Sequence, residues 1–511
     1  MGGALARAGL FALLAIPALA LALSQPGEDA RACGTAGPFD FDTLELEDHV
    51  AGYGLAIELA VEGKAAQFTY DWGGETIDIR YQGLLAGNRA NRTTQPSTGH
   101  RIPPTIYKSI AWIEASWSNA GYTVPYGGVG PVLRAPDCGY GLGQITTGMS
   151  NNSGTASGRQ ALIGTHFLFN LAEGVRILAD KWNSAPRYRP IAGNGDPAAL
   201  EDWYYAIWSY NGFAAGNHPL YDTDHTMEWA DHYLNPSRNP LRGEVYHCYD
   251  PSAPGSGQFG YGDYTYPERV YGCVRYPPTK GNARMWTPQV FNMPDFDREE
   301  VASAFSPLNF INCEDANVND LRAACQPMDF LTSFEDDPET PEDEGVTTHA
   351  DTSPVANAAA AAAFRGEPAL KVDGPATATL AVFSDGTASK LTITVTNSGT
   401  WIAPFRVRST APWLVARHPN DPSTRTLDGG VAIGVETNVV LTSTPRVTQK
   451  GYASQLNVSL NAAMVPPGGG TATLWIEPLF GSGAKYELQI TATKAGAPLR
   501  YRVLAPGISA E

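Results

Sequence analysis

Residues 106–117 read Ile106-Tyr107-Lys108-Ser109-Ile110-Ala111-Trp112-Ile113-Glu114-Ala115-Ser116-Trp117. Pro103 and Pro104 precede this stretch, and proline is well tolerated in the first turn of a helix. Apolar side chains then recur at spacings of four, three and four residues, at Ile106, Ile110, Ile113 and Trp117. Such spacing places them on one helical face. The pattern predicts a helix over Pro104–Ser118, with Glu114 near its carboxyl end.

Glu114 lies beside aromatic and aliphatic residues of this predicted helix: Trp112, Ile113 and Trp117. A carboxyl group held against apolar surface is costly to ionise, so we expect its pKa to be raised. A proton retained near neutral pH can be donated to a glycosidic oxygen. A surface glutamate or a buried ion-pair partner is the alternative, and this helix alone does not exclude it.

Three later segments combine glycine with amide or hydroxyl side chains. Glycine lets the backbone approach a ligand closely, and an amide both donates and accepts hydrogen bonds. The segments are the loop Cys138–Ile145 with Gln144, the helical stretch Asn170–Leu178 with Gly174, and the helix end Tyr205–Phe213 with Tyr210 and Asn211.

These four segments, in this order, resemble the catalytic domain of SLT-type lytic transglycosylases, in the goose-type lysozyme-like superfamily. That family has a catalytic glutamate at a helix end, then a Gly-Leu-Met-Gln loop, an Asn-x-x-x-Gly helix and an Ala-Tyr-Asn-Ala-Gly segment. The matching residues are Glu114; Gly141, Leu142 and Gln144; Asn170 and Gly174; Tyr210 and Asn211. Tyr266–Val270 resembles the family's closing aromatic-then-valine helix, so the resemblance covers Ile102–Val274.

The resemblance implies an enzyme that cuts peptidoglycan glycan strands between N-acetylmuramic acid and N-acetylglucosamine. Glu114 would protonate the bridging oxygen and then accept the proton of the muramoyl C6 hydroxyl, giving a 1,6-anhydro product. No cofactor and no metal are implied. The implied substrate-binding residues are Gly141, Leu142, Gln144, Tyr210, Asn211 and Ser116.

The chain departs from the family pattern at several positions. Ala115 stands where the family has serine, so Ser116 offers the nearest hydroxyl, and Gly143 replaces methionine, which we expect to widen the loop. Tyr122–Pro136 lengthens the interval between Glu114 and Gln144, and Gly212-Phe213 replaces Ala-Gly. We expect altered specificity from these differences.

Other readings of the same residues remain open. Ordinary glycosidases need two carboxylates, and Asp137 and Glu173 are the candidates for a second one; we expect Asp137 to shape its loop and Glu173 to lie on a helix surface. A hydrolase of peptidoglycan or chitin, a non-catalytic glycan-binding protein and a surface or assembly protein are the rival functions. His225, Glu228 and His232 share a helical spacing, but without an HExxH pattern they favour a solvated face over a metal site.

Charge and the amino terminus bear on location. Arg7, the apolar run Leu10–Leu23 and the small residues before Pro26 have the order of a secretory signal peptide over 1–24, although an uncleaved anchor is possible. No later stretch is long and apolar enough to cross a membrane. With a formal net charge of −17, we expect no binding to nucleic acid. The protein is predicted to be secreted or to lie in the cell envelope.

The cysteines and the acidic stretch divide the chain. Behind a signal peptide, an even number of cysteines predicts disulfides, with Cys248–Cys273 and Cys313–Cys325 suggested by nearness and Cys33–Cys138 remaining. Zinc is the competing reading, but no CxxC pair supports it. Eight carboxylates and no lysine or arginine between Glu335 and Asp351 predict an extended, solvated linker.

Beyond the linker, apolar and polar residues alternate in short runs separated by turn residues. The runs are Ala376–Phe383, Ser389–Thr396, Val431–Leu441, Gln455–Leu460, Thr471–Ile476 and Tyr486–Thr493. They predict an antiparallel β-sandwich, and Leu391–Leu414 resembles immunoglobulin-like accessory domains of secreted bacterial proteins. Trp401 and Trp413 are either sugar platforms or, more often for a sandwich, core residues. A cell-envelope partner of the sandwich is possible.

We therefore predict an α+β multidomain protein: a mainly α-helical, lysozyme-like catalytic domain followed by an all-β immunoglobulin-like sandwich. The predicted boundaries are 1–24 for the signal peptide, 25–330 for the catalytic domain with a disulfide-tied loop extension, 331–365 for the linker and 366–511 for the sandwich.

Overall fold

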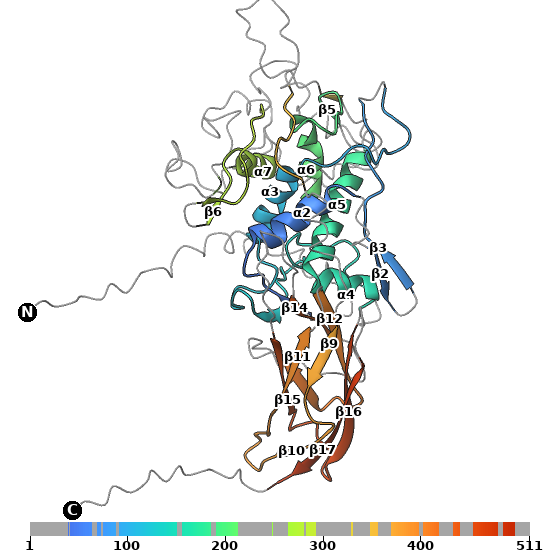
Figure 1. Ribbon diagram of the computed structural model, residues 1–511, viewed down its shortest axis with the longest axis vertical. Helices are drawn as coiled ribbons and strands as arrows, with labels where there is room; N and C mark the ends of the chain where they lie inside the picture. Colours follow the sequence, from blue (N-terminus) through green and yellow to red (C-terminus); the bar gives the residue numbers. More distant parts are fainter. Residues whose placement is uncertain are drawn as a thin grey trace, which may run out of the picture.

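The computed structural model describes residues 39, 41–63, 69–72, 75–87, 91–150, 156–184, 191–212, 248, 264–280, 283–292, 329–330, 348–355, 369–397, 402–417, 433–439, 453–478 and 484–495. These residues contain both helices and sheets, which confirms the α+β class. The helices form one part of the molecule and most of the strands form another, at opposite ends of its long axis (Figure 1). The predicted signal peptide, the His225 cluster, Cys33, Cys313, Cys325 and Trp401 lie outside the described residues.

The helix predicted around Glu114 is present as α3, Pro104–Ala115, and proline occupies its first turn. Most of its apolar face is buried, since Ile106, Ile110 and the following Trp117 have no exposed surface and Ile113 is partly buried. The helix ends because Ser116 and Trp117 adopt left-handed backbone angles, with φ of 50° and 55°. It therefore stops just before Ser116, and Glu114 is in its last turn.

The remaining helices surround α3. The helical stretch expected at Asn170–Leu178 is present within α5, whose apolar side chains Leu168, Leu171 and Leu178 have no exposed surface. Two others begin with a capping box, in which a hydroxyl and a glutamine or glutamate satisfy the first amides. The bounds are η2 Val50–Gly54, α2 Leu55–Ala60, α4 Gly158–Thr165, α5 Phe167–Asn183, η4 Glu201–Trp203, α6 Tyr204–Tyr210 and α7 Tyr266–Arg275.

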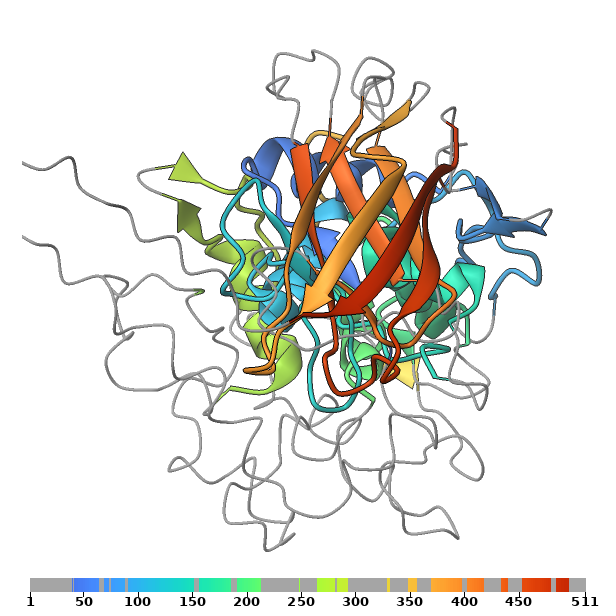
Figure 2. The same cartoon turned by 90° about the horizontal axis from the view of Figure 1, so that it is seen from below.

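The carboxyl-terminal part consists of strands from two sheets. One has the order β10-β17-β16-β12-β14-β1-β4 and the other β13-β15-β11-β9. Figure 2, seen from below, shows these strands crossing in front of the helices. The bounds are β9 Leu370–Asp373, β10 Thr377–Val382, β11 Leu391–Asn397, β12 Ile402–Ser409, β13 Leu414–Arg417, β14 Ile433–Val439, β15 Ala453–Leu460, β16 Gly470–Pro478 and β17 Tyr486–Lys494.

Each alternating run of the sequence corresponds to one of these strands, whereas β9, β12 and β13 were not predicted. Trp413 is 5% exposed and lies within the core, with a ring carbon 3.6 Å from where a Cβ on Gly470 would stand. It is therefore a core residue and not a sugar platform.

The larger sheet extends into the helical part. β1, Asp42–Leu44, pairs in parallel with β14 and in antiparallel with β4, Val129–Pro131. In the part of the chain that the structure describes, three further sheets have two strands each: β2 Thr69–Trp72 with β3 Glu75–Asp78, β5 Ile191–Ala192 with β8 Asp329–Phe330, and β6 Thr279–Lys280 with β7 Ala283–Arg284. Because β1 covers the edge of β14, hydrogen bonds of one sheet join the two parts.

Part of the predicted linker is packed against the helices. In residues 348–355, hereafter the strap, Asp351 and Ser353 are only 8% and 5% exposed. Both oxygens of Asp351 accept hydrogen bonds from protein donors. The expectation of a solvated spacer is wrong for this stretch, because its carboxylate finds buried partners that composition does not reveal.

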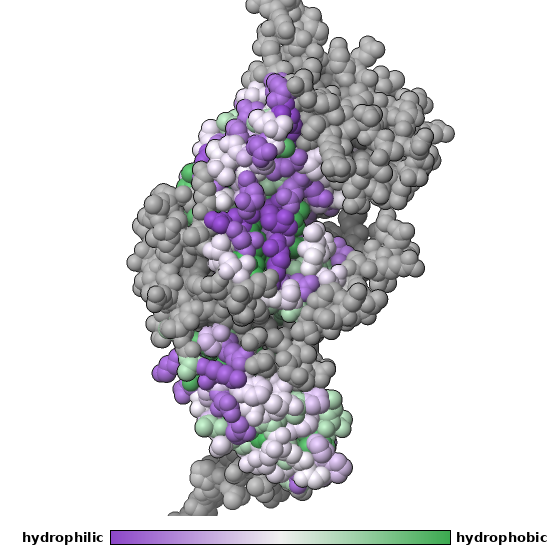
Figure 3. Space-filling model, turned by 90° about the vertical axis from the view of Figure 1, so that its right-hand side faces the viewer, coloured by the Kyte–Doolittle hydropathy of each residue, from purple (hydrophilic) through white to green (hydrophobic). Residues whose placement is uncertain are grey.

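The predicted Cys248–Cys273 disulfide is confirmed, and Cys138 is also disulfide-bonded. Such bonds are compatible with an oxidising compartment. Among the described residues, no helix is long and apolar enough to cross a membrane. On the face drawn in Figure 3, hydrophilic residues gather over the helical part, and the sandwich surface is more mixed.

Candidate active site

Glu114 is at the carboxyl end of α3, where the amino end of α7 meets it. The Tyr266 hydroxyl donates a 2.5 Å hydrogen bond to Oε1 of Glu114. Tyr266 is 2% exposed and begins α7, whose first turn is fixed by Thr265 and Glu268. Glu114 is half-buried, and its Oε1 is held by the hydroxyl of the buried Tyr266.

The surroundings of Glu114 raise its pKa from 4.5 to about 7. Burial is the main cause, because the protein shields the charged form from water. The charge of Asp137 raises the pKa further, whereas the Tyr266 hydrogen bond and the charge of Arg269 lower it. The group can therefore hold a proton near neutral pH and release it with little cost, as an acid/base catalyst requires.

The chain leaving α3 is held in a strained conformation. Left-handed backbone angles at Ser116 and Trp117 cost on the order of 1 kcal/mol each for residues other than glycine. Burial of the Trp117 ring offsets this cost: the ring stacks on Trp286 with centroids 5.1 Å apart, and its Nε1 donates to the Lys108 carbonyl. Oε2 of Glu45 then accepts from the amides of Asn119 and Ala120, each at 2.8 Å.

Two tyrosines, Tyr107 and Tyr210, pack against two glycines, Gly143 and Gly174, in the region of Glu114. The hydroxyls of Tyr107 and Tyr210 lie 3.4 Å apart, and Tyr210 donates to the Gly143 carbonyl at 2.9 Å. A Cβ on Gly174 would stand 1.6 Å from the Tyr107 hydroxyl, and one on Gly143 would stand 2.8 Å from it. Both positions therefore require glycine. The expectation that Gly143 widens the loop is wrong, because the two tyrosines fill the space.

Asn170 fastens the glycine-rich loop to α5 and is completely buried. Its Oδ1 accepts from the Gly143 amide at 2.9 Å, and its Nδ2 donates to the carbonyls of Tyr140 and Ile163. These bonds satisfy every polar atom of the amide, so the loop is held rigidly. Asn170 is a structural residue of the site and does not face a ligand.

The structure brings some of the predicted site residues together and assigns others to support. Burial raises the pKa of Tyr210 well above its usual value, and the charges of Tyr107 and Glu114 raise it further. Gln144 is half-buried with a φ of 44°, and its Nε2 donates to the Gly141 carbonyl at 2.7 Å. Ser116 is half-buried in the left-handed cap of α3, and Asn211 is exposed at the end of α6.

Gly141 and Leu142 belong to the scaffold. Leu142 has no exposed surface and lies in the hydrophobic core. Gly141 is buried with a φ of +66°, and a Cβ there would stand 2.6 Å from Nδ2 of Asn170. These two residues shape the loop and present no side chain to a substrate.

The two candidates for a second carboxylate differ sharply. Glu173 is 1% exposed and paired with Arg159 and Arg176. The expectation that it lies on a helix surface is wrong, because two guanidinium groups compensate its burial. Asp137 is exposed, and its Oδ1 accepts from the Gly139 amide at 3.1 Å, which agrees with a role in shaping the loop.

Sequence reasoning did not find the partners of Glu114. Tyr266 was noted only as the start of a closing helix, and it lies 152 residues further along the chain. Arg269 follows it by one turn on the same helix, which a search for cations near the helix start could have found. Tyr107 gave no signal, because an aromatic residue in a largely apolar helix indicates core.

Among the described residues, no group of three or more His, Cys, Asp or Glu side chains is arranged to hold a metal ion.

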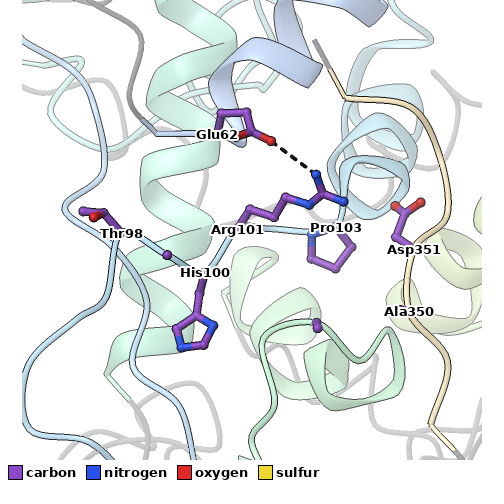
Figure 4. Close-up of a pocket in the computed structure, with 9 residues that line it drawn as sticks. Glu62, Thr98, His100, Arg101, Pro103, Ala350 and Asp351 are labelled. Atoms are coloured by element: carbon purple, nitrogen blue, oxygen red, sulfur yellow. Dashed lines mark hydrogen bonds and ion pairs between the residues drawn. The ribbon is translucent and has the colours of Figure 1, made fainter. Parts of the chain in front are cut away.

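A cavity of about 340 Å³ lies at the other end of α3, lined by Glu62, His100, Arg101 and the strap (Figure 4). Pro103 and Glu114 are separated by about 16 Å of helix at 1.5 Å per residue. The cavity is therefore distinct from the Glu114 site.

Replacing Tyr266 by phenylalanine tests the contact with Glu114. The hydrogen bond lowers the Glu114 pKa, so its loss should raise that pKa above its present value of about 7. If Glu114 acts as a general acid, the alkaline limb of the pH–rate profile moves to higher pH, and the maximal rate falls about tenfold as the acid becomes weaker and less well oriented. A limb that moves to lower pH would contradict the assignment.

No family model matches the chain, and no curated protein matches it. A solved structure of the ASH/PapD-like domain 7 of human CEP192 is 14% identical over 25% of this chain and 87% of that domain, with a TM-score of 0.16. The periplasmic chaperone SfaE is 8% identical over 26% of this chain and 59% of the chaperone, with a TM-score of 0.14. Neither is a lysozyme-like protein, and both likenesses are too weak to assign a fold.

Proposed function

We propose that the protein is a peptidoglycan lytic transglycosylase in which Glu114 is the acid and then the base. The observation that carries the proposal is the raised pKa of about 7 of a half-buried carboxyl group at a helix end, held by Tyr266. The group protonates the glycosidic oxygen between N-acetylmuramic acid and N-acetylglucosamine. It then accepts the proton of the muramoyl C6 hydroxyl, whose oxygen attacks the anomeric carbon and closes the 1,6-anhydro ring.

The surroundings of Glu114 support a mechanism with one carboxylate. Glu173 is neutralised by Arg159 and Arg176, so it has no free oxygen for catalysis. Asp137 is exposed in the loop turn that it stabilises. Intramolecular attack by the C6 hydroxyl requires no second carboxylate, whereas ordinary glycoside hydrolysis does.

The proposal includes the setting of the enzyme. The helical part is a lysozyme-like catalytic domain, the strands beyond it are an immunoglobulin-like sandwich, and the protein is secreted or held in the cell envelope. The order of the sequence motifs and the Cys248–Cys273 disulfide support this reading. The sandwich would contact a cell-envelope partner, and peptidoglycan strands would bind across Glu114, Tyr210, Gln144, Asn211 and Ser116.

Hydrolysis of the same bond is the second candidate, because the charge of Asp137 acts on Glu114. A hydrolase would use Asp137 to activate a water molecule. Mass spectrometry of products from purified peptidoglycan decides between the two. Anhydromuropeptides support the transglycosylase, and reducing-end muropeptides support the hydrolase.

Replacing Asp137 by asparagine sharpens the decision. For a transglycosylase, anhydromuropeptides persist and the rate stays within about threefold, because no water is activated. The Glu114 pKa falls, since the neighbouring negative charge that raises it is gone, and the alkaline limb moves to lower pH. This direction is opposite to that expected for Tyr266→Phe. Loss of all product with Asp137→Asn would favour hydrolysis.

A further inference from the structure

The strap, residues 348–355, contacts the amino end of the helix that carries Glu114. Oδ2 of Asp351 accepts from the amide of Thr105 at 2.8 Å and from its hydroxyl at 2.7 Å. The other oxygen, Oδ1, accepts from the amide of Ser353. α3 has no side-chain cap from its own flanking residue, Pro103. A carboxylate from 246 residues away therefore caps this helix, where its charge also suits the helix dipole.

The same strap is bound to the turn that precedes α6. The carboxylate of Glu201 in η4 is buried and accepts from the His349 amide at 3.0 Å. The side-chain Nδ1 of His349 lies 2.7 Å from Oε1, the other carboxylate oxygen of Glu201. The Leu200 amide donates back to the His349 carbonyl at 2.8 Å. η4 leads directly into α6, which ends at Tyr210.

A third set of bonds connects the strap to α7. Oε1 of Gln289 accepts from the amide and the hydroxyl of Thr352, both at 2.9 Å. The backbone N–H of Gln289 donates to the carbonyl of Val274, which lies in the last turn of α7. Because Tyr266 begins this helix, all three elements that carry Glu114, Tyr210 and Tyr266 are attached to one strap of eight residues.

We propose that the strap positions Glu114, Tyr210 and Tyr266 by fastening α3, η4–α6 and the segment after α7 to one another. Figure 4 shows Ala350 and Asp351 on the strap beside Arg101 and Pro103, and all four residues line the cavity. The strap contains Asp351, the last carboxylate of the acidic stretch, and it precedes the sandwich in sequence. The kinetic consequence rests on the proposed function, but the fastening itself does not.

Asp351→Ala in the full chain tests the proposal. Misplacement of catalytic groups by a fraction of an ångström lowers the turnover rate more than substrate binding, so we expect kcat to fall about tenfold with KM within about twofold. Asp351→Asn keeps an oxygen acceptor for Thr105 and should recover most of the rate. Asp385→Ala is the matched control, because Asp385 also accepts from the amide and hydroxyl of one threonine, Thr387, but lies in the sandwich hairpin.

Amide hydrogen exchange followed by mass spectrometry gives a readout that does not depend on activity. The proposal predicts faster exchange in α6 and α7 as well as α3 for Asp351→Ala, and no change in any of them for Asp385→Ala. Faster exchange confined to the first turn of α3, with an unchanged kcat, would reduce Asp351 to a local cap and overturn the proposal. If the wild type cuts no glycan, the proposed function fails. Hydrogen exchange alone then tests whether the strap fastens α3, α6 and α7 to one another.

His349→Ala covers the case in which Asp351→Ala does not fold. Its side chain is 26% exposed, and the main-chain bonds of His349 to Glu201 and Leu200 do not depend on it. We expect a fall in kcat in the same direction and faster exchange in α6. An unchanged kcat together with unchanged exchange would overturn the role of the strap.

Discussion

Glu114→Gln will lower the release of muropeptides from peptidoglycan by about a thousandfold or more, because the variant can neither donate nor accept the transferred proton. Glutamine has nearly the shape of glutamate and can still accept the Tyr266 hydrogen bond. Substrate binding should therefore persist. Mass spectrometry of the soluble products, with pull-down on the same insoluble walls, measures both properties.

The same substitution should stabilise the fold at neutral and alkaline pH. The Glu114 pKa is about 7 in the folded protein against 4.5 for an ordinary glutamate, so the folded state holds this proton more tightly than the unfolded chain does. The wild type therefore loses stability as pH rises from 4.5 to about 7, and glutamine does not. We expect the variant to be more stable by on the order of 2 kcal/mol above this range.

The comparison with the wild type at acid pH is the control. Well below pH 4.5 the Glu114 side chain is neutral in both the folded and the unfolded state, and the two unfolding curves should coincide. Retained cleavage by Glu114→Gln would show that another group carries the chemistry. A variant less stable than the wild type at pH 8 would show that the carboxyl group is not held in its neutral form.

Lys108→Ala will destabilise the protein by about 3–5 kcal/mol, because it leaves a buried carboxylate without its counter-charge. Nζ of Lys108 in α3 lies 2.7 Å from Oε1 of Glu58 in α2, and the two side chains are 5% and 6% exposed. Oε2 of Glu58 has no hydrogen-bond partner among the described residues. Equilibrium unfolding in urea measures the loss.

An exposed ion pair in the same region supplies the matched control. Arg101 precedes α3 and pairs with Glu62 after α2 at 3.3 Å, with side chains 41% and 29% exposed. Arg101→Ala should cost less than about 1 kcal/mol, because water screens the pair. The double variant Glu58→Leu with Lys108→Met removes both buried charges and should regain most of the stability. Equal losses for Lys108→Ala and Arg101→Ala would contradict the burial argument.

Features that depend on neighbouring residues could be predicted from the sequence. The spacing of Ile106, Ile110 and Ile113 indicated α3, and alternation at 389–396 indicated β11, because side-chain direction repeats with the helical or extended backbone. The same local pattern placed Glu114 near the end of this helix among apolar neighbours, and the resemblance of the four ordered motifs then singled it out. Nearness along the chain also indicated the Cys248–Cys273 disulfide.

Features that depend on distant partners could not be predicted. Whether Glu173 lies on the surface or in the interior follows from Arg159 and Arg176, and composition suggested the wrong answer. Leu142 looked like part of a substrate loop but faces the core. In each case, the environment of a side chain depends on which element packs against it. The periodicity of the sequence does not indicate which element that is.

Local patterns in the sequence predicted α3, α5 and the strands β10, β11 and β14 to β17, and they marked the carboxyl group in the last turn of α3 as a candidate. Only the tertiary structure decided that Tyr266 holds Glu114, that β1 continues the strands of the sandwich, and that Asp351 caps α3. The reason is physical. Backbone periodicity is a local property, whereas these contacts join residues more than 150 positions apart and arise only when the helices have packed.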